Sequence, residues 1–151
     1  MTTIAYRNGV MAADSRCSAG GTVTGNVDKI FKNKRGDLCG VCGSSVLSAE
    51  FARWFLNKER GPVPKLGSED SSISAMVVRS GLLTKVEIFE GAGSFEFSDC
   101  ETGSYYATGS GYEIALGAMH AGASAFDAVR AAIHHDTRSG GPIRTLRLGR
   151  D

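Results

Sequence analysis

The first fourteen residues constrain the fold most, because they read as two strands joined by a tight turn. Apolar residues run almost without a break on both sides of Asn8-Gly9, and this dipeptide is a strong signal for a two-residue hairpin turn. Strands in which apolar residues do not alternate with polar ones are typically covered on both faces. We therefore predict strands over Thr3–Arg7 and Val10–Asp14, with further layers of structure on each side of the hairpin.

The rest of the chain alternates between strand pairs and blocks of helix. Strand pairs are expected over residues 29–32 with 38–42 and 74–79 with 83–90, and single strands over 95–97, 105–107 and 142–148. Residues 61–72 read as a loop. This order indicates an α+β fold in which antiparallel sheets are covered by helices. The length of 151 residues fits one domain over residues 1–151.

Three helices are expected, and two of them carry an apolar stripe. The first begins at Ser44 or Ser45 and runs to about Lys58, with an apolar face of Val46, Leu47, Phe51, Trp54 and Phe55. The second spans residues 110–120. The third follows a sequence similar to a capping box, Ser124 to Asp127, and its stripe consists of Phe126, Val129, Ala132 and Ile133.

Composition and charge argue against several classes of protein. The net charge is +1 and the charges are dispersed, so no nucleic-acid partner is expected. No apolar run approaches the ~20 residues of a membrane span, so no membrane association is expected. The chain does not open with the pattern of a signal peptide, and we expect a cytoplasmic protein.

Four cysteines are present, and Cys39 and Cys42 form a C-x-x-C motif. This spacing occurs in zinc and redox sites. Here the motif falls in a predicted strand, where residues three apart face opposite sides of the sheet. The two thiols are therefore expected to be structural, and we expect neither a metal nor any other cofactor.

Thr2 is a candidate nucleophile at the start of the chain. It becomes the N-terminal residue if Met1 is removed, and a small second residue is what methionine removal tolerates. Its α-amine, with a reference pKa of ~7.7–8.0, then lies beside its own hydroxyl and can accept the hydroxyl proton. The competing interpretation is that Thr2 and Thr3 are merely good strand formers.

Five short motifs, in order along the chain, resemble those of the proteasome β-subunit and of its bacterial relative HslV. They are Thr2-Thr3-Ile4 with Ala12-Ala13-Asp14-Ser15-Arg16, Gly25-Asn26-Val27 with Lys29, Gly40-Val41-Cys42-Gly43-Ser44, Gly109-Ser110-Gly111, and Asp136-Thr137-Arg138-Ser139-Gly140-Gly141. Each motif alone is weak, and their shared order over most of the chain carries the resemblance. The last motif is typical of proteasomes rather than of HslV.

The resemblance implies the N-terminal-nucleophile hydrolase fold, a four-layer αββα sandwich of two antiparallel sheets flanked by helices. It also implies a threonine peptidase that cleaves polypeptide substrates within a homo-oligomer of stacked rings, with an AAA+ unfoldase ATPase as a further partner. The chain departs from the family pattern in a shorter first hairpin and in a shorter stretch between Lys58 and Tyr105. These differences bear on the ring contacts and the ATPase-facing surface more than on the site motifs.

By the same resemblance, Thr2 is the nucleophile and two charged residues adjust its reactivity. Lys29 is expected to lie close to Thr2 and to lower the pKa of the Thr2 amine through like-charge repulsion. Asp14 is expected to pair with Lys29 and to hold it charged. The alternative is an aspartate and a lysine that lie on the surface and never meet.

Four further residues have roles implied by the resemblance. The backbone N–H of Gly43 would stabilise the oxyanion of the tetrahedral intermediate. Ser110, Asp136 and Ser139 would orient the Thr2 amine and a water molecule. The alternatives are structural, with Gly43 as a turn glycine, Ser110 as a helix cap, and Asp136 and Ser139 as turn residues.

Substrate peptides in this family add a strand alongside the segments after Arg16 and around Gly43, so main-chain hydrogen bonds supply affinity and side-chain pockets supply selectivity. The residues implied for substrate binding are Cys17, Ser18, Val27, Phe31, Val41 and Ser45. Because several of these side chains are apolar, cleavage after apolar residues is expected.

Two other functions are compatible with the sequence. One is a non-catalytic ring or scaffold protein with the same fold, in which Met1 is retained. The other is an amidase of the same fold that acts on a small molecule, although the proteasome-like segment from Asp136 to Gly141 argues against it.

Overall fold

The computed structural model describes residues 2–57, 72–79, 82–88, 96–100 and 105–151. In chain order the helices and strands are β1 (Thr3–Arg7), β2 (Val10–Ala13), β3 (Arg16–Ala19), β4 (Thr22–Asn26), β5 (Ile30–Lys32), β6 (Leu38–Gly43), α1 (Ser45–Leu56), β7 (Ile73–Arg79), β8 (Leu82–Ile88), β9 (Glu96–Cys100), β10 (Tyr105–Gly109), α2 (Tyr112–His120), α3 (Ala125–His135) and β11 (Arg144–Arg147).

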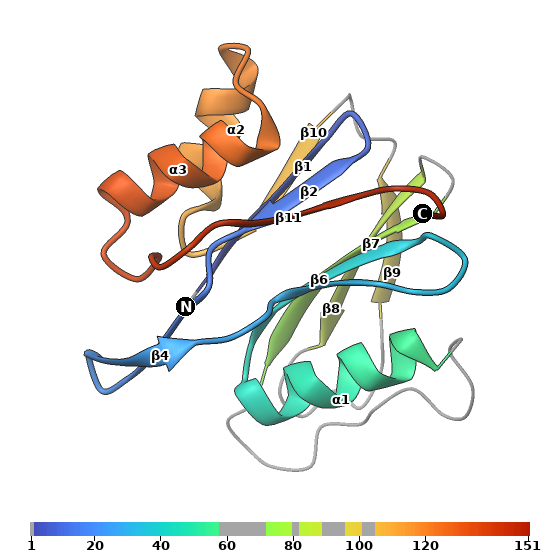
Figure 1. Ribbon diagram of the computed structural model, residues 1–151, viewed down its shortest axis with the longest axis horizontal. Helices are drawn as coiled ribbons and strands as arrows, with labels where there is room; N and C mark the ends of the chain where they lie inside the picture. Colours follow the sequence, from blue (N-terminus) through green and yellow to red (C-terminus); the bar gives the residue numbers. More distant parts are fainter. Residues whose placement is uncertain (1, 58–71, 80–81, 89–95, 101–104) are drawn as a thin grey trace.

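These elements form four layers (Figure 1). One sheet has the strand order β10-β1-β2-β11 and the other has the order β5-β6-β7-β8-β9, and neighbouring strands are antiparallel in both. Helices α2 and α3 cover the outer face of the first sheet, and α1 covers the outer face of the second (Figure 1). The predicted αββα sandwich of two antiparallel sheets is thus confirmed.

The opening hairpin lies at the centre of the first sheet. Asn8 and Gly9 have φ angles of 49° and 79°, the left-handed pair that a type I′ turn requires. β1 pairs with β2 on one side and with β10 on the other, and β2 pairs in turn with β11. Ile4 faces the second sheet while Ala5 faces the helices, so the prediction that both faces are covered is confirmed.

The alternating side chains of the strands separate three apolar layers. The layer between the two sheets includes Ile4, Met11, Leu38, Met76 and Val78. The layer under α1 includes Val41, Phe51, Phe55, Ala75 and Val77. The layer under α2 and α3 is built mainly from small residues, among them Ala5, Ala12, Ala107, Ala115 and Ala128. Small side chains on both partners let these two helices approach the first sheet closely.

The two cysteines of the C-x-x-C motif face opposite sides of β6. Cys39 lies in the layer under α1, and Cys42 lies in the layer between the sheets. This confirms the geometry expected from the period of a strand. Burial raises the pKa of both thiols, so both remain neutral and act as small apolar side chains.

The hairpin of β3 and β4 was not predicted. It forms a separate two-stranded sheet, and a signal for it was present, because Gly20-Gly21 is a typical two-residue hairpin turn. The last strand is shorter than predicted, at Arg144–Arg147. Most of the predicted loop 61–72, the turn at residues 80–81 and the strand ends at 89–90 and 95 lie outside the described residues.

Two side chains assigned to helix stripes are exposed, and those assignments were wrong. Val46 is 70 % exposed, because the buried face of α1 centres on Leu47, Phe51 and Phe55 and position 46 lies on the opposite side of the helix. Phe126 is 42 % exposed, because it lies at the edge of the buried face of α3.

The helix starts differ in how they are capped. Ser44 occupies the N-cap position of α1, but its side chain makes no capping hydrogen bond. Ser124 caps α3 as predicted, since its hydroxyl accepts a hydrogen bond from the backbone N–H of Asp127 at 3.1 Å. α2 has Gly111 rather than Ser110 at its N-cap. No helix within the described ranges is long and apolar enough to cross a membrane.

Candidate active site

A buried ion pair lies where the first hairpin meets the start of β5. Lys29 Nζ is 3.0 Å from Asp14 Oδ1, and the two residues are 7 % and 1 % exposed. The same ammonium donates a hydrogen bond to the carbonyl oxygen of Arg16 at 2.8 Å. A buried charge is tolerated only with such partners. The structure therefore brings together Asp14 and Lys29, which the sequence separates by fifteen positions.

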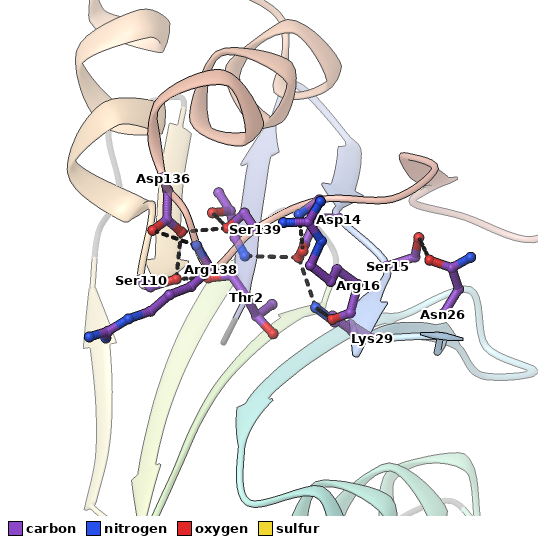
Figure 2. A network of polar contacts seen from close by, with 12 residues as sticks. Thr2, Asp14, Ser15, Arg16, Asn26, Lys29, Ser110, Asp136, Arg138 and Ser139 are labelled. Atoms are coloured by element: carbon purple, nitrogen blue, oxygen red, sulfur yellow. Dashed lines mark hydrogen bonds and ion pairs between the residues drawn. The ribbon is translucent and has the colours of Figure 1, made fainter. Parts of the chain in front are cut away.

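Asp14 also connects the ion pair to the backbone on both sides. Its Oδ1 accepts a hydrogen bond from the N–H of Thr3 at 3.0 Å, and its Oδ2 accepts one from the N–H of Gly140 at 2.9 Å. The carbonyl oxygen of Gly140 in turn accepts hydrogen bonds from the N–H groups of Ser15 and Arg16. One carboxylate thus holds the start of β1, Lys29 and the segment before β11 in fixed relation (Figure 2).

Thr2 lies next to this network and is 5 % exposed. Its carbonyl oxygen packs so closely against Gly109 that a Cβ atom at position 109 would overlap it. Gly109 also has a φ of +98°, in the region that favours glycine. A glycine at the end of β10 is therefore what allows the chain start to sit against this strand.

A second polar network lies on the other side of Thr2. Ser110 and Ser139 each donate a hydrogen bond of 2.6 Å to Asp136 Oδ2, and the N–H of Arg138 donates to Oδ1 at 3.2 Å (Figure 2). Burial acts to raise the pKa of Asp136, but these hydrogen bonds outweigh it, and the pKa is lowered from 3.8. The carboxylate is therefore ionised at neutral pH.

The two serines connect this network to the first residues of β1. Ser110 Oγ lies 3.3 Å from the carbonyl oxygen of Thr2, which is a second and more distant acceptor for the one hydroxyl proton besides Asp136 Oδ2. Ser139 Oγ lies 2.7 Å from Thr3 Oγ1. The structure thus brings together Ser110, Asp136 and Ser139, which were expected to orient the Thr2 amine. The two serines contact the carbonyl oxygen of Thr2 and the hydroxyl of Thr3.

Gly43 ends β6 immediately before α1. Its φ is +118°, and a Cβ atom there would overlap the carbonyl oxygen of Ser72, so the position accepts glycine and little else. The N–H of Ser44 donates to that same oxygen at 3.0 Å. Gly43 lies at the N-terminus of α1, where the helix dipole favours negative charge.

The site borders a cavity of about 730 Å³. Three residues expected to be catalytic line it, namely Thr2, Lys29 and Gly43. The six residues expected to bind substrate also line it, namely Cys17, Ser18, Val27, Phe31, Val41 and Ser45. Asp14, Ser110, Asp136 and Ser139 do not line the cavity. Asp14 contacts the cavity-lining Lys29, and Ser110 contacts the carbonyl oxygen of Thr2, whereas Asp136 lies one contact farther away, behind Ser110, and Ser139 contacts Asp136 in turn. Within the described part of the chain, no cluster of three His, Cys, Asp or Glu side chains could hold a metal ion.

Sequence reasoning missed two residues of these polar networks. Thr3 is fully buried and bonds to both networks, to Asp14 through its N–H and to Ser139 through its hydroxyl. Gly140 bonds to Asp14 through its N–H. Both residues belong to motifs noted in the sequence, but the contacts of Thr3 with Ser139 and of Gly140 with Asp14 join positions more than a hundred residues apart. No local pattern contains that information.

Comparison with known proteins finds similar folds among solved structures. No protein-family model matches the sequence, and no curated protein sequence matches it. BPH of Thiobacillus denitrificans in complex with epoxomicin is 18 % identical with a TM-score of 0.67, covering 99 % of this chain and 98 % of that one. HslV of Trypanosoma brucei is 20 % identical with a TM-score of 0.65, covering 97 % and 99 %. Anbu of Hyphomicrobium sp. strain MC1 is 12 % identical with a TM-score of 0.58, covering 100 % and 88 %.

These similarities extend over whole chains at low identity. They show that this chain has the proteasome β-subunit and HslV type of N-terminal-nucleophile hydrolase fold.

Proposed function

We propose that this protein is a threonine-type endopeptidase in which Thr2, exposed by removal of Met1, is the N-terminal nucleophile. Met1 lies outside the described residues, so its removal is part of the proposal. The observation that carries the proposal is that Thr2 and Lys29, the cation of the buried Lys29–Asp14 pair, line the same cavity. A buried cation is costly to maintain, and in this proposal the site uses it to adjust the amine.

The proposed reaction begins with proton transfer within Thr2. The free amine accepts the hydroxyl proton, directly or through a water molecule, as Oγ1 attacks the carbonyl carbon of the scissile bond. The C–N bond then breaks, the amine passes its proton to the leaving nitrogen, and an ester to Thr2 remains. Water attacks the acyl carbon of that ester and gives a proton to the amine. The bond between the acyl carbon and Oγ1 then breaks, the ammonium returns the proton to Oγ1, and the second product leaves as a carboxylic acid, so that Thr2 returns to its starting state.

Lys29 and Gly43 would support the charge changes of these steps. The Lys29 ammonium lowers the pKa of the Thr2 amine by like-charge repulsion and favours the deprotonated hydroxyl. Asp14 holds the Lys29 ammonium in place through the 3.0 Å contact. The N–H of Gly43, at the positive end of α1, would donate to the oxyanion, and loss of such a donor typically costs about 3–4 kcal/mol. Ser110, Asp136 and Ser139 would hold the start of β1 in position behind the amine.

A substrate peptide would lie along the edge of β3 and past Gly43, with a side chain in the cavity. The walls there include Val27, Phe31 and Val41, which supports cleavage after apolar residues. The proposal includes assembly into homo-oligomeric rings in the cytoplasm, with an AAA+ unfoldase ATPase supplying polypeptide substrates, and the fold similarity to HslV and Anbu supports the ring assembly.

The test combines the mass of the intact protein with turnover of fluorogenic peptides. We expect the mass to lack one methionine, a peptide boronate to modify Thr2, and Thr2→Ala to abolish turnover. Epoxomicin is a second probe, since it was observed in complex with a protein of similar fold. Thr22→Ala removes a hydroxyl from an exposed position of β4 outside the cavity, so this variant serves as the matched control and should retain activity.

Each other outcome selects a different function. Retention of Met1 in every preparation would contradict catalysis by Thr2 and leave the non-catalytic ring component. Turnover of small amides without turnover of any peptide would point to the amidase.

A further inference from the structure

One face of helix α1 forms a long wall of the cavity beside Thr2. The residues of α1 that line the cavity are Ser45, Ser48, Ala49, Ala52, Arg53 and Leu56. Their spacing of three and one follows one side of a helix through all of its turns. Every one of these side chains before Arg53 is small, so the cavity stays open along the helix. Its volume of about 730 Å³ exceeds what one amino-acid side chain would fill.

Arg53 is the cation on this wall, and it is exposed. Among the described residues its guanidinium makes no ion pair and no hydrogen bond. The other charged residues that line the cavity are engaged elsewhere. Lys29 pairs with Asp14, Asp28 pairs with Arg144 at 2.7 Å, and the Arg16 guanidinium lies against Gly140 and reaches the carbonyl oxygen of Thr137 at 3.5 Å. Arg53 is therefore the positive group on α1 that a ligand in the cavity can pair with.

The distance along the helix sets which part of a ligand would meet Arg53. Ser45 starts α1 beside Gly43, and Arg53 follows eight positions later, which corresponds to a rise of ~12 Å at ~1.5 Å per residue. A peptide whose extended main chain passes Gly43 and continues alongside α1 advances ~3.3 Å per residue, so ~12 Å corresponds to three or four residues.

We propose that Arg53 is a specificity-determining residue that selects peptides carrying a carboxylate three or four residues from the scissile bond. This inference rests on the proposed peptidase function and adds a substrate class to it, namely peptides that are apolar at the cleavage position and acidic farther along. The carboxylate forms a charge-assisted hydrogen bond with the guanidinium, and no covalent step is involved.

The test is a set of fluorogenic peptides that share one apolar residue at the cleavage position. Each peptide has a single Glu at one of the five positions on either side, and each is matched with the same peptide carrying Gln. Exposed ion pairs contribute up to about 1 kcal/mol, so we expect kcat/KM to be about fivefold higher for Glu than for Gln at one position and equal elsewhere. Because Arg53 is exposed, raising the salt concentration to about 0.5 M should reduce this ratio.

Variants identify the residue responsible. Arg53→Gln should bring the Glu-to-Gln ratio close to one, and Arg53→Lys should keep part of it. Arg130→Gln removes an exposed arginine from α3, outside the cavity, and should leave the ratio and the activity unchanged. A ratio near one in the unmodified protein, or a ratio that persists in Arg53→Gln, would overturn the proposal.

A binding measurement separates this inference from the proposed function. Fluorescence anisotropy with labelled Glu and Gln peptides reports affinity for the Thr2→Ala protein, in which no cleavage is expected. If no peptide is cleaved by the unmodified protein but the Glu peptide still binds about fivefold more tightly, the peptidase function fails and the acidic subsite stands. If cleavage occurs and affinity does not distinguish the peptides, the subsite fails alone.

Discussion

Two aspartates flank Thr2, and they are held in different ways. Asp14 is 1 % exposed and is surrounded by an ammonium and two backbone N–H groups. Asp136 is partly exposed and is surrounded by two hydroxyl groups and one backbone N–H. Both carboxylates therefore have several donors within hydrogen-bond distance. They differ in burial and in whether one of those donors carries a full charge. The donors around each carboxylate can be followed in Figure 2.

This difference predicts that the surroundings of Asp14 and of Asp136 respond differently to substitution. Removal of a partner from a buried ion pair leaves an uncompensated charge away from water, which is among the most destabilising changes in proteins. When a neutral donor is removed from a partly exposed carboxylate, water can take the place of that donor. We therefore expect the Asp14 side of the site to tolerate few changes and the Asp136 side to tolerate several.

The largest expected effect is that of Asp14→Ala. This change leaves the buried Lys29 ammonium without its counter-ion and leaves the N–H groups of Thr3 and Gly140 without that acceptor. We expect the free energy of unfolding to fall by about 3–5 kcal/mol, measured by urea denaturation.

Asp136→Ala is the matched comparison, with an expected loss of about 1–2 kcal/mol. A double variant, Asp14→Asn with Lys29→Met, should recover part of the stability lost in Asp14→Ala because no buried charge remains. Equal losses for the two single alanine variants would show that burial and charge do not distinguish the two sides.

Much of the fold could be predicted because it depends on local chemistry. The Asn8-Gly9 turn needs two residues that tolerate positive φ, and the opposite facing of Cys39 and Cys42 needs only the period of a strand. The stripe on α1 was partly wrong at Val46, because an apolar residue next to Leu47 in sequence lies about 100° away on the helix and ended up on the solvent side. The period of a helix predicts which of its faces is buried, whereas the packing of neighbouring elements decides how far the buried face extends.

The candidate site was predictable to a smaller extent. Motifs brought Asp14, Lys29 and Asp136 to attention, but Thr3 was not singled out, although it bonds to both networks. The contact between Thr3 and Ser139 joins residues 136 positions apart. This contact forms only because β11 pairs with β2 and so brings the segment before β11 against the first hairpin. Contacts of this kind depend on the whole topology rather than on any window of sequence.

An intermediate effect is expected when the two serines of the Asp136 network are compared. Ser139 is 1 % exposed and also contacts the fully buried Thr3 hydroxyl, so Ser139→Ala leaves a buried polar group without that partner. We expect a loss of about 1–3 kcal/mol. Ser110 is partly exposed and water can replace its hydroxyl, so Ser110→Ala should cost about 0.5–1 kcal/mol.

Urea denaturation of both serine variants measures the difference. A larger loss for Ser110→Ala than for Ser139→Ala would contradict the role assigned to Thr3 in joining the two networks.

The smallest expected effect is a pH dependence confined to the Asp136 side. Hydrogen bonds from Ser110, Ser139 and Arg138 outweigh the opposing effect of burial and lower the pKa of Asp136 from 3.8 in the folded state. A group whose pKa is lowered in the folded state contributes stability that is fully present when the pH is above the pKa of the unfolded state. That stability is lost as the pH falls through the pKa of the folded state. The stability difference between the unmodified protein and Asp136→Asn should thus be constant from pH 7 down to about 5 and should shrink below pH 3.8. Urea denaturation at a series of pH values measures it, and a difference that shrinks already between about pH 7 and 5 would show that the carboxylate is not held in its ionised form by these donors.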